Sequence, residues 1–324
     1  MMSKGPATDS GLGRPSVPGV YVSLHELMSF EFKAAGLSFL PRRRSSSVLA
    51  GRHASRVRGR GLNFEEIRDY FPGDDIRTID WKVTLRLGSP HVRAYTEERD
   101  RPALFIVDQR LSMFFGSRQA MKSVTAAHLT ALGIWMVFRA GDRVGGIVFN
   151  DEETWRIRPH RSRSRVESIF AALVAMNQSL RVDSPLQPNS SQLDRAIEGA
   201  LAVAGHDHLI IIASDFAGAG ERTQQLLREL VAHNDVIAAL IFDPLAQTGH
   251  HGGRIVVTEG RLQIEVNLGV KKVREPIESF STGRLRQVAE LLRRSDVPLM
   301  MVNTADDVVT QVRHLLGRRT QSAV

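Results

Sequence analysis

Two acidic side chains stand where apolar segments of the sequence end. Residues 103–108 read ALFIVD and residues 209–215 read LIIIASD, so Asp108 and Asp215 each close a run that is typical of a buried strand. In an open parallel sheet, ligands bind beyond the carboxyl ends of the strands. If the two strands are neighbours, both carboxylates lie at this edge, where they could hold a divalent cation or serve a hydrolytic reaction.

Three more polar residues are expected at the same edge of the sheet. The loop after Asp108 contains Arg110 and Ser112, and a predicted helix begins at Ser191. Hydroxyl and carboxylate oxygens are hard ligands that suit Mg²⁺. A guanidinium group cannot bind a metal, and its N–H donors pair with carboxylates. If Arg110 points inward, it bridges Asp108 and Asp215 in place of an ion; if it points outward, the site stays open to a metal.

The elements that would position these residues alternate along the chain. Helical patterns follow strand patterns throughout residues 101–320, which predicts one α/β domain with a doubly wound, mainly parallel sheet. The predicted strands are residues 103–108, 144–150, 154–158, 209–215, 236–243 and 297–302, with a hairpin at 254–258 and 263–266. The predicted helices are residues 119–138, 164–177, 191–204, 221–233, 283–294 and 305–316. Arg156 and Arg158 alternate in one strand, which we therefore expect at an edge of the sheet.

The N-terminal third does not show this alternation of strand and helix patterns. Residues 1–20 are rich in Gly, Pro and Ser, which predicts a flexible tail. Residues 22–36 have the apolar spacing of a short helix, and residues 42–60 form a basic connector with seven arginines and no acid. Residues 61–98 contain strand-like pieces around a Pro-Gly turn. We group residues 21–100 as a helix, a connector and a small β-rich module.

Composition excludes several classes of protein. The chain has no cysteine, so thiol catalysis, zinc–thiolate sites and disulfides are excluded, and a reducing compartment fits. Its apolar stretches fall far short of the roughly 18 residues that a membrane helix needs. We expect no transmembrane segment, no secretory signal and a cytoplasmic location. The net charge of +8, from 43 Lys and Arg against 35 Asp and Glu, suits an acidic or nucleic-acid partner.

The N-terminal module carries a family resemblance. The run GRGLNFEEIRDYFPGDDIRTIDWKVTLRLGSPHVRAYTEERD, residues 59–100, resembles the bacterial domain-of-unknown-function family 58, and the resemblance extends over about residues 45–243. A structural role is expected for the motif residues Gly73, Asp74, Asp75, Arg77, Asp80 and Trp81.

A second resemblance concerns the predicted sheet edge. An Asp-x-Ser-x-Ser loop, a Thr loop and a later Asp, in this order, define the metal-ion-dependent adhesion site of von Willebrand factor A domains. Asp108, Ser112, Ser191 and Asp215 are similar to that pattern, whereas Arg110 stands where the pattern has Ser. The resemblance implies a metal held by the four matching residues, and Arg110 argues against it. We expect no cofactor, with Mg²⁺ or another divalent ion as the alternative.

The family resemblance also implies a role. Members join such a module to a von Willebrand A-like domain and are typically associated with MoxR-type AAA+ ATPases. We therefore expect a non-enzymatic adaptor that acts in assembly or remodelling of a protein complex. Its expected contact face is the edge formed by Asp108, Arg110, Ser112, Ser191 and Asp215, and an acidic residue of the partner could pair with Arg110.

Two other function classes stay open. Asp108 and Asp215 could serve a metal-dependent hydrolase, or the chain could be a basic nucleic-acid-binding protein. Five arginines between residues 156 and 165 add a second basic tract to the connector. Because this tract has no interleaved aromatic residues, an acidic protein surface is the expected counterpart.

Overall fold

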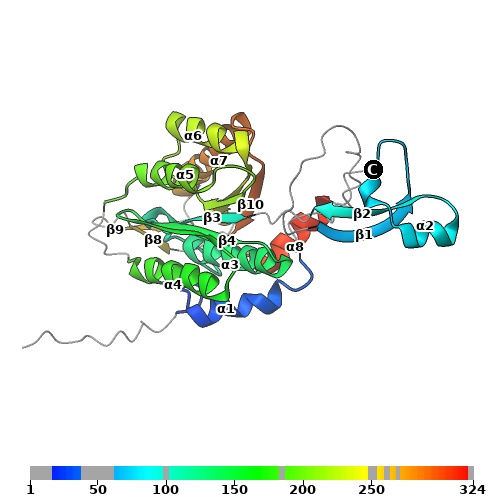
Figure 1. Cartoon of the computed structure of the whole chain (residues 1–324). Helices are drawn as coiled ribbons and strands as arrows, with labels where there is room; N and C mark the ends of the chain where they lie inside the picture. The colour runs from blue at the N-terminus through cyan, green and yellow to red at the C-terminus, as the bar shows by residue number, and fades with distance from the viewer. Residues whose placement is uncertain are drawn as a thin grey trace, which may run out of the picture. The chain divides into compact units, whose positions relative to one another are not determined.

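The computed structural model describes residues 17–37, 62–97, 102–181, 187–246, 254–258, 263–267 and 271–319 (Figure 1). The chain divides into two compact units, one of residues 1–39 with 101–324 and one of residues 40–100. The tail predicted for the first residues lies mostly outside the described residues, and the basic connector lies wholly outside them.

The large unit is built around a six-stranded sheet. The strand order is β10-β7-β6-β3-β4-β5, and every neighbouring pair is parallel except β4 with β5. The strands are β3 (Ala103–Asp108), β4 (Val144–Phe149), β5 (Thr154–His160), β6 (Leu209–Ser214), β7 (Asp235–Phe242) and β10 (Leu299–Asn303). This arrangement confirms the predicted mainly parallel α/β sheet and places β5 at its edge, as expected from its alternating arginines.

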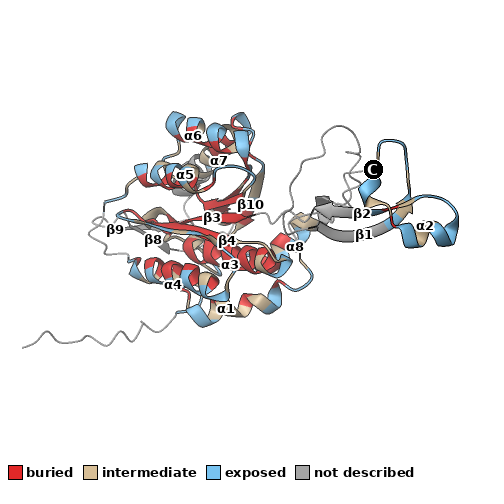
Figure 2. Ribbon diagram, viewed as in Figure 1, coloured by how far each residue is buried: buried red, intermediate tan, exposed pale blue. Residues whose placement is uncertain are grey.

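Helices cover both faces of this sheet. Helices α1 (Leu24–Lys33), α3 (Lys122–Ala140), α4 (Arg163–Ser179) and α8 (Val308–Arg319) pack on one face, and α5 (Ser191–Val203), α6 (Glu221–His233) and α7 (Lys271–Arg294) on the other. Strands β3, β4 and β6 are buried along their whole length (Figure 2). Their continuous apolar sequences are the pattern that a doubly covered strand requires.

Helix α1 belongs to the large unit and corrects the expected grouping of residues 21–100. Its Leu27 and Phe30 are buried in the core beside α3, and the Trp135 Nε1–H donates to the Leu27 carbonyl at 3.2 Å. Just before the helix, the Val22 N–H donates to the Asn177 Oδ1 at 2.9 Å. The sequence indicates the apolar stripe of α1 but not the surface that covers it.

The small module pairs two antiparallel strands, β1 (Leu62–Asp69) and β2 (His91–Glu97). Between them lie the 3₁₀ turn η1 (Ile76–Thr78) and the helix α2 (Trp81–Leu87). The sequence predicts strand-like pieces here, so helix α2 is a correction to that prediction. Caps at both ends stabilise this short helix. Asp80 accepts hydrogen bonds from two backbone N–H groups of the first turn, and Gly88 ends the helix with φ 77°.

The first motif residues hold the turn after β1. Asp74 accepts two hydrogen bonds of 2.8 Å from the Arg68 guanidinium and one of 2.9 Å from the Phe71 N–H. Gly73 has φ +112°, the positive value that the predicted Pro-Gly turn requires. The Arg68 hydrogen bonds and ion pair lower the pKa of Asp74, together with the Phe71 N–H.

The remaining motif residues divide into two groups. Asp75 accepts a hydrogen bond from the Arg77 N–H at the start of η1, and Asp80 pairs with Arg93 on β2 at 2.7 Å. Both aspartates therefore stabilise local structure. Trp81, which we grouped with the structural residues, is 66% exposed and has no such role among the described residues.

The C-terminal elements follow the predicted order. The hairpin of β8 (Arg254–Thr258) and β9 (Gln263–Asn267) is present, and α7 begins at Lys271, before the predicted start at residue 283. Among the residues described, none of the helices is both long and apolar enough for a bilayer span.

Candidate functional site

Four loops meet at the carboxyl end of the parallel strands. They are residues 109–113 after β3, 150–153 after β4, 187–190 before α5 and 215–220 after β6. We call these loops the rim, together with Asp108 at the end of β3 and Ser191 at the start of α5. Strands β3 and β6 are neighbours, with Val107 beside Ala213. Asp108 and Asp215, the two acids predicted at strand ends, therefore lie at the ends of adjacent strands.

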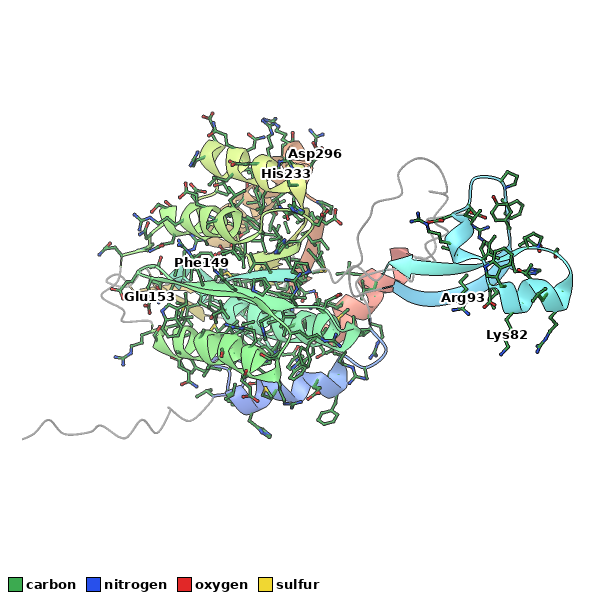
Figure 3. The ribbon with its side chains drawn as sticks, viewed as in Figure 1. Lys82, Arg93, Phe149, Glu153, His233 and Asp296 are labelled. Atoms are coloured by element: carbon green, nitrogen blue, oxygen red, sulfur yellow. The ribbon has the colours of Figure 1, made fainter. Side chains whose placement is uncertain are left out.

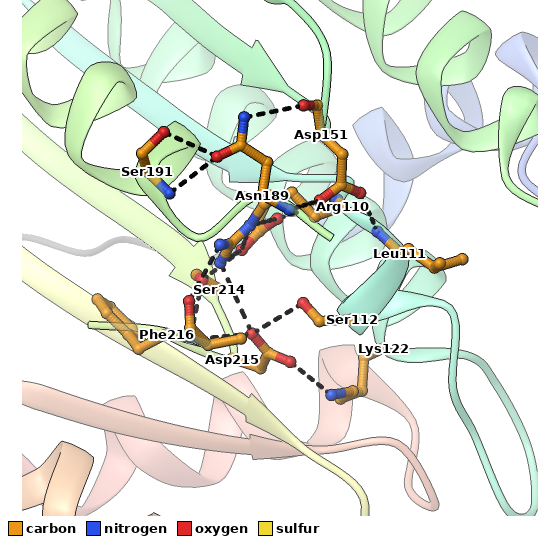
Figure 4. A network of polar contacts seen from close by, with 12 residues as sticks. Arg110, Leu111, Ser112, Lys122, Asp151, Asn189, Ser191, Ser214, Asp215 and Phe216 are labelled. Atoms are coloured by element: carbon orange, nitrogen blue, oxygen red, sulfur yellow. Dashed lines mark hydrogen bonds and ion pairs between the residues drawn. The ribbon is translucent and has the colours of Figure 1, made fainter. Parts of the chain in front are cut away.

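Arg110 points inward from the loop after β3 (Figure 4). It pairs with Asp108. The Arg110 Nη2 lies 2.7 Å from Oδ2 of Asp108, and Nε lies 3.0 and 3.1 Å from the two carboxylate oxygens. The Arg110 backbone N–H also donates to Oδ1 at 3.0 Å. Asp108 is fully buried and Arg110 is 2% exposed, so this is a buried ion pair.

The other polar groups of this pair are also occupied. The Ser214 hydroxyl donates to Asp108 Oδ2 at 2.6 Å, and Arg110 Nη1 donates to the Ala217 carbonyl at 3.0 Å. The guanidinium carbon lies 5.5 Å from the centre of the Phe149 ring. Burial alone would lower the pKa of Arg110, but the charge and hydrogen bonds of Asp108, with Asp215 and Asp151 further away, raise it. Arg110 therefore stays charged inside the sheet edge.

Asp215 is held mainly by a second cation. Lys122 Nζ, at the start of α3, lies 2.6 Å from Asp215 Oδ2, whereas Arg110 Nη2 lies 3.9 Å from Oδ1. The Ala217 N–H and the Ser112 hydroxyl donate to Oδ1 at 2.8 and 3.3 Å. Burial alone would raise the pKa of Asp215, but the charges of Lys122 and Arg110 and these hydrogen bonds lower it to about 2.

This lowered pKa predicts a dependence of stability on acid. The ordinary pKa of the group is 3.8, so Asp215 stabilises the fold above pH 4, and this contribution is lost as the pH falls through about 2. At 1.36 kcal/mol per pKa unit, the free energy of unfolding should fall by about 2 kcal/mol more in the parent than in Asp215→Asn between pH 5 and pH 2. Urea unfolding at a series of pH values measures this difference. The variant Glu229→Gln changes an exposed residue of α6, and its free energy of unfolding should vary with pH as in the parent. If the free energy of unfolding fell equally with pH in the parent and in Asp215→Asn, the lowered pKa of Asp215 would be contradicted.

Asp151 joins two loops of the rim and was missed from the sequence. Its Oδ2 accepts from the Leu111 N–H at 2.6 Å and its Oδ1 accepts from the Asn189 N–H at 2.8 Å. In the sequence it lies in the acidic turn between two strands, which favours a solvated position. Its buried carboxylate is instead a brace between the loops after β3 and before α5.

Ser191 is the one predicted residue that the structure places apart from the acids. Its hydroxyl donates to Asn189 Oδ1 at 2.7 Å, and its side chain is exposed at the start of α5. Through Asn189 it contacts the Asp151 brace, and among the described residues its hydroxyl does not bond to Asp108 or Asp215. Of the five rim residues that we predicted, Asp108, Arg110, Ser112 and Asp215 form one network.

The loop after β6 has an unusual backbone. Phe216 is buried with φ +52°, a left-handed value that is uncommon for an aromatic residue, and its N–H donates to the Ser214 hydroxyl at 2.8 Å. This conformation places the Ala217 carbonyl on Arg110. Two residues later Gly218 has φ +78°, and a Cβ there would lie 2.3 Å from the Ser190 Cβ. The loops after β6 and before α5 therefore touch.

The donor set does not fit a metal ion in this arrangement. Both oxygens of Asp108 are bonded to Arg110 and Ser214, and both oxygens of Asp215 are bonded to Lys122, Ser112 and the Ala217 N–H. A cation at this position would have to displace Arg110, because like charges repel at this range. Within the described ranges, no three His, Asp or Glu residues are grouped to hold a metal ion. Our expectation about cofactors remains a prediction.

The fold and this network define a mixed α/β protein with a mostly parallel six-stranded sheet, a small antiparallel module and a braced rim. The chain belongs to the family described as protein of unknown function DUF58, which matches residues 66–286. This match confirms the family that residues 59–100 resemble.

The relatives and solved structures extend this comparison. Uncharacterized protein Mb1516 of Mycobacterium bovis and uncharacterized protein Rv1480 of Mycobacterium tuberculosis are each 24% identical over 297 residues, or 89% of both chains. Among solved structures, a conserved hypothetical protein BatB from Bacteroides thetaiotaomicron matches with a TM-score of 0.42 and 16% identity, over 69% of this chain and 98% of that chain. An aerotolerance-related membrane protein from Bacteroides fragilis matches with a TM-score of 0.42 and 13% identity, over 67% and 99%.

Proposed function

We propose that this protein is a non-enzymatic adaptor whose large unit is a von Willebrand A-like domain with a degenerate adhesion site. It acts in the cytoplasm with a MoxR-type AAA+ ATPase, in assembly or remodelling of another protein complex. That the partner is a MoxR-type ATPase is inferred from the family resemblance alone. What supports a degenerate site is the buried pair of Arg110 and Asp108, because the resemblance assigns Asp108 to the ion-binding pattern and the structure occupies it with a guanidinium group.

The buried pair changes the role that we assign to the predicted contact residues. Because Asp108 and Arg110 are buried and their polar atoms are used inside the protein, they position the rim and do not themselves touch a partner. This replaces our expectation that an acid of the partner pairs with Arg110. The partly exposed Ser112 and the exposed Ser191 and Gly218 offer the contact surface.

The module supplies a second observation in favour of an interaction protein. Its exposed apolar residues include Phe71 at 62%, Ile76 and Trp81 at 66%, and Leu85 at 84%. Trp81 and Leu85 are four residues apart in α2 and therefore share one face of the helix. Trp81 and Leu85 therefore form an exposed apolar pair, a feature that protein contact sites show.

Affinity capture with quantitative mass spectrometry tests the adaptor role. The immobilised full chain should retain a MoxR-type ATPase from extract of its own organism at low salt, and the purified ATPase should then bind the chain directly. Recovery of no AAA+ ATPase would contradict the proposal.

Two matched variants test whether the rim makes the contact. Ser191→Trp places a bulky side chain on the rim and should weaken binding of the purified ATPase by about tenfold or more, which corresponds to about 1.4 kcal/mol. Ser168→Trp, at an exposed position of α4, should bind like the parent. Equal binding by both variants would remove the rim from the proposal. Turnover that depends on Mg²⁺ or Mn²⁺ and is lost in Asp215→Ala would instead favour the hydrolase alternative.

A further inference from the structure

Strand β5 forms an edge of the large sheet, and part of that edge is open in the region that the structure describes. It pairs with β4 on one side only, and the turn between the two strands is also part of the rim. Phe149 and Glu153 mark the two sides of this turn (Figure 3). An edge strand exposes backbone N–H and C=O groups that can pair with another chain, so natural edges are usually blunted.

The hydrogen bonds around the turn show which backbone groups face outward. The Asn150 N–H donates to the Glu153 carbonyl at 3.0 Å, whereas the Phe149 carbonyl accepts from Gln109 on the other side, at 2.8 Å. Along antiparallel strands, residue pairs that share backbone hydrogen bonds alternate with pairs that do not. Asn150 and Glu153 form a hydrogen-bonded pair. The next pair, Phe149 with Thr154, is therefore not hydrogen-bonded, and the same holds two residues further on for Ile147 with Arg156. The backbone N–H and C=O groups of Thr154 and Arg156 therefore point away from the sheet.

The features that blunt this edge lie further along the strand. The register shifts between Val144 and Gly146 of β4, and Pro159 lies near the end of β5. A bulge and a proline are typical protections of an edge. They leave the stretch from Thr154 to Ile157 in regular register and free of proline, and Arg158 lies at the register shift.

The open stretch also carries fixed positive charge. Arg156 lies in the regular stretch and Arg158 directly beyond it, and both side chains are exposed. Arg156 lies against α5, because a Cβ at Gly199 would come within 2.6 Å of its Nε. No ion pair joins either arginine to another described residue, and the sequence has no acid between Thr154 and Val166. Two exposed cations therefore lie beside open backbone donors and acceptors.

We propose that the outer edge of β5 binds an extended acidic segment of a partner protein by strand addition. The backbone of the segment pairs with Thr154 and Arg156, and acidic side chains of the segment lie beside Arg156 and Arg158, since opposite charges across neighbouring strands attract. A nucleic acid has no backbone ladder that could match these groups. The surface uses residues other than those of the proposed rim contact and goes beyond it.

A labelled peptide tests this binding site on the full chain. Fluorescence anisotropy in 50 mM salt would follow the probe TEVEVET, which alternates acids with β-branched residues. Three probes are compared: this peptide, the same sequence with every backbone nitrogen methylated, and TKVKVKT. The acidic peptide should bind at least about tenfold more tightly than either of the others, because the methylated form keeps the charge and loses every N–H donor.

Matched charge reversals locate the site. Arg158→Glu should weaken binding of TEVEVET by about tenfold or more, whereas Arg313→Glu, an exposed site on α8, should change it by less than about twofold. Equal binding of the methylated peptide, an equal effect of the two variants, or no binding by the parent would overturn the proposal. Ser191→Trp should leave peptide binding unchanged, so failure of the rim contact and failure of the β5 site are separate results.

Discussion

Replacing Arg110 by methionine is expected to lower the free energy of unfolding by about 3–5 kcal/mol. The change removes the cation from a fully buried Asp108 and leaves its carboxylate with the Ser214 hydroxyl and one backbone N–H. A buried charge that has lost its partner is far more destabilising than the absence of the whole pair. Urea unfolding followed by circular dichroism measures the difference from the parent.

Two further variants separate this effect from a general loss of packing. The double variant Asp108→Asn with Arg110→Met removes both charges and should be more stable than Arg110→Met alone, because the uncompensated charge is gone. Arg195→Met, at an exposed position on α5, should change stability by less than about 0.5 kcal/mol. A loss below about 1 kcal/mol in Arg110→Met, or an equally unstable double variant, would contradict the buried-pair assignment.

Replacing Leu27 by alanine is expected to destabilise the large unit by about 2–5 kcal/mol. Leu27 is fully buried in the core that α1 shares with α3 and α4, and the change leaves a cavity beside Trp135. Urea unfolding of the full chain, followed by circular dichroism, measures the loss. The result tests whether α1 is part of the large unit.

Helix α1 also provides the control for this experiment. Leu24 lies on the same helix but is 40% exposed, so Leu24→Ala should cost clearly less, about 1 kcal/mol or below. If Leu27→Ala were no more destabilising than Leu24→Ala, α1 would not be anchored in the core as described.

The strands of the large unit could be predicted from the sequence because their burial leaves a simple signal. Continuous apolar runs mark β3 and β6, and Arg156 and Arg158 mark the edge strand β5. Two elements were harder to predict for local reasons. Helix α2 has only seven residues and depends on the cap at Asp80. Helix α7 includes Pro276 and Gly283, and both residue types disfavour a helix.

The site was predictable only in part. The ends of two buried strands placed Asp108 and Asp215 at one edge, and the chemistry of a guanidinium group favoured an inward Arg110. Lys122 gave no signal, because a lysine at the start of a helix is usually solvated and its partner is 93 residues away in the chain. Asp151 was missed because acidic residues in a hairpin turn are usually exposed, and only the fold places the N–H groups of Leu111 and Asn189 beside it.

We propose that the Arg110 guanidinium takes the place that the adhesion site of von Willebrand A domains gives to a divalent ion. Calorimetric titration of Mn²⁺ into the parent and into Arg110→Ser, in the same buffer, tests it most directly. The variant restores a hydroxyl at position 110 beside Asp108 and Ser112, so it should take up one ion that the parent does not bind. Equal uptake by the parent and the variant would contradict the claim.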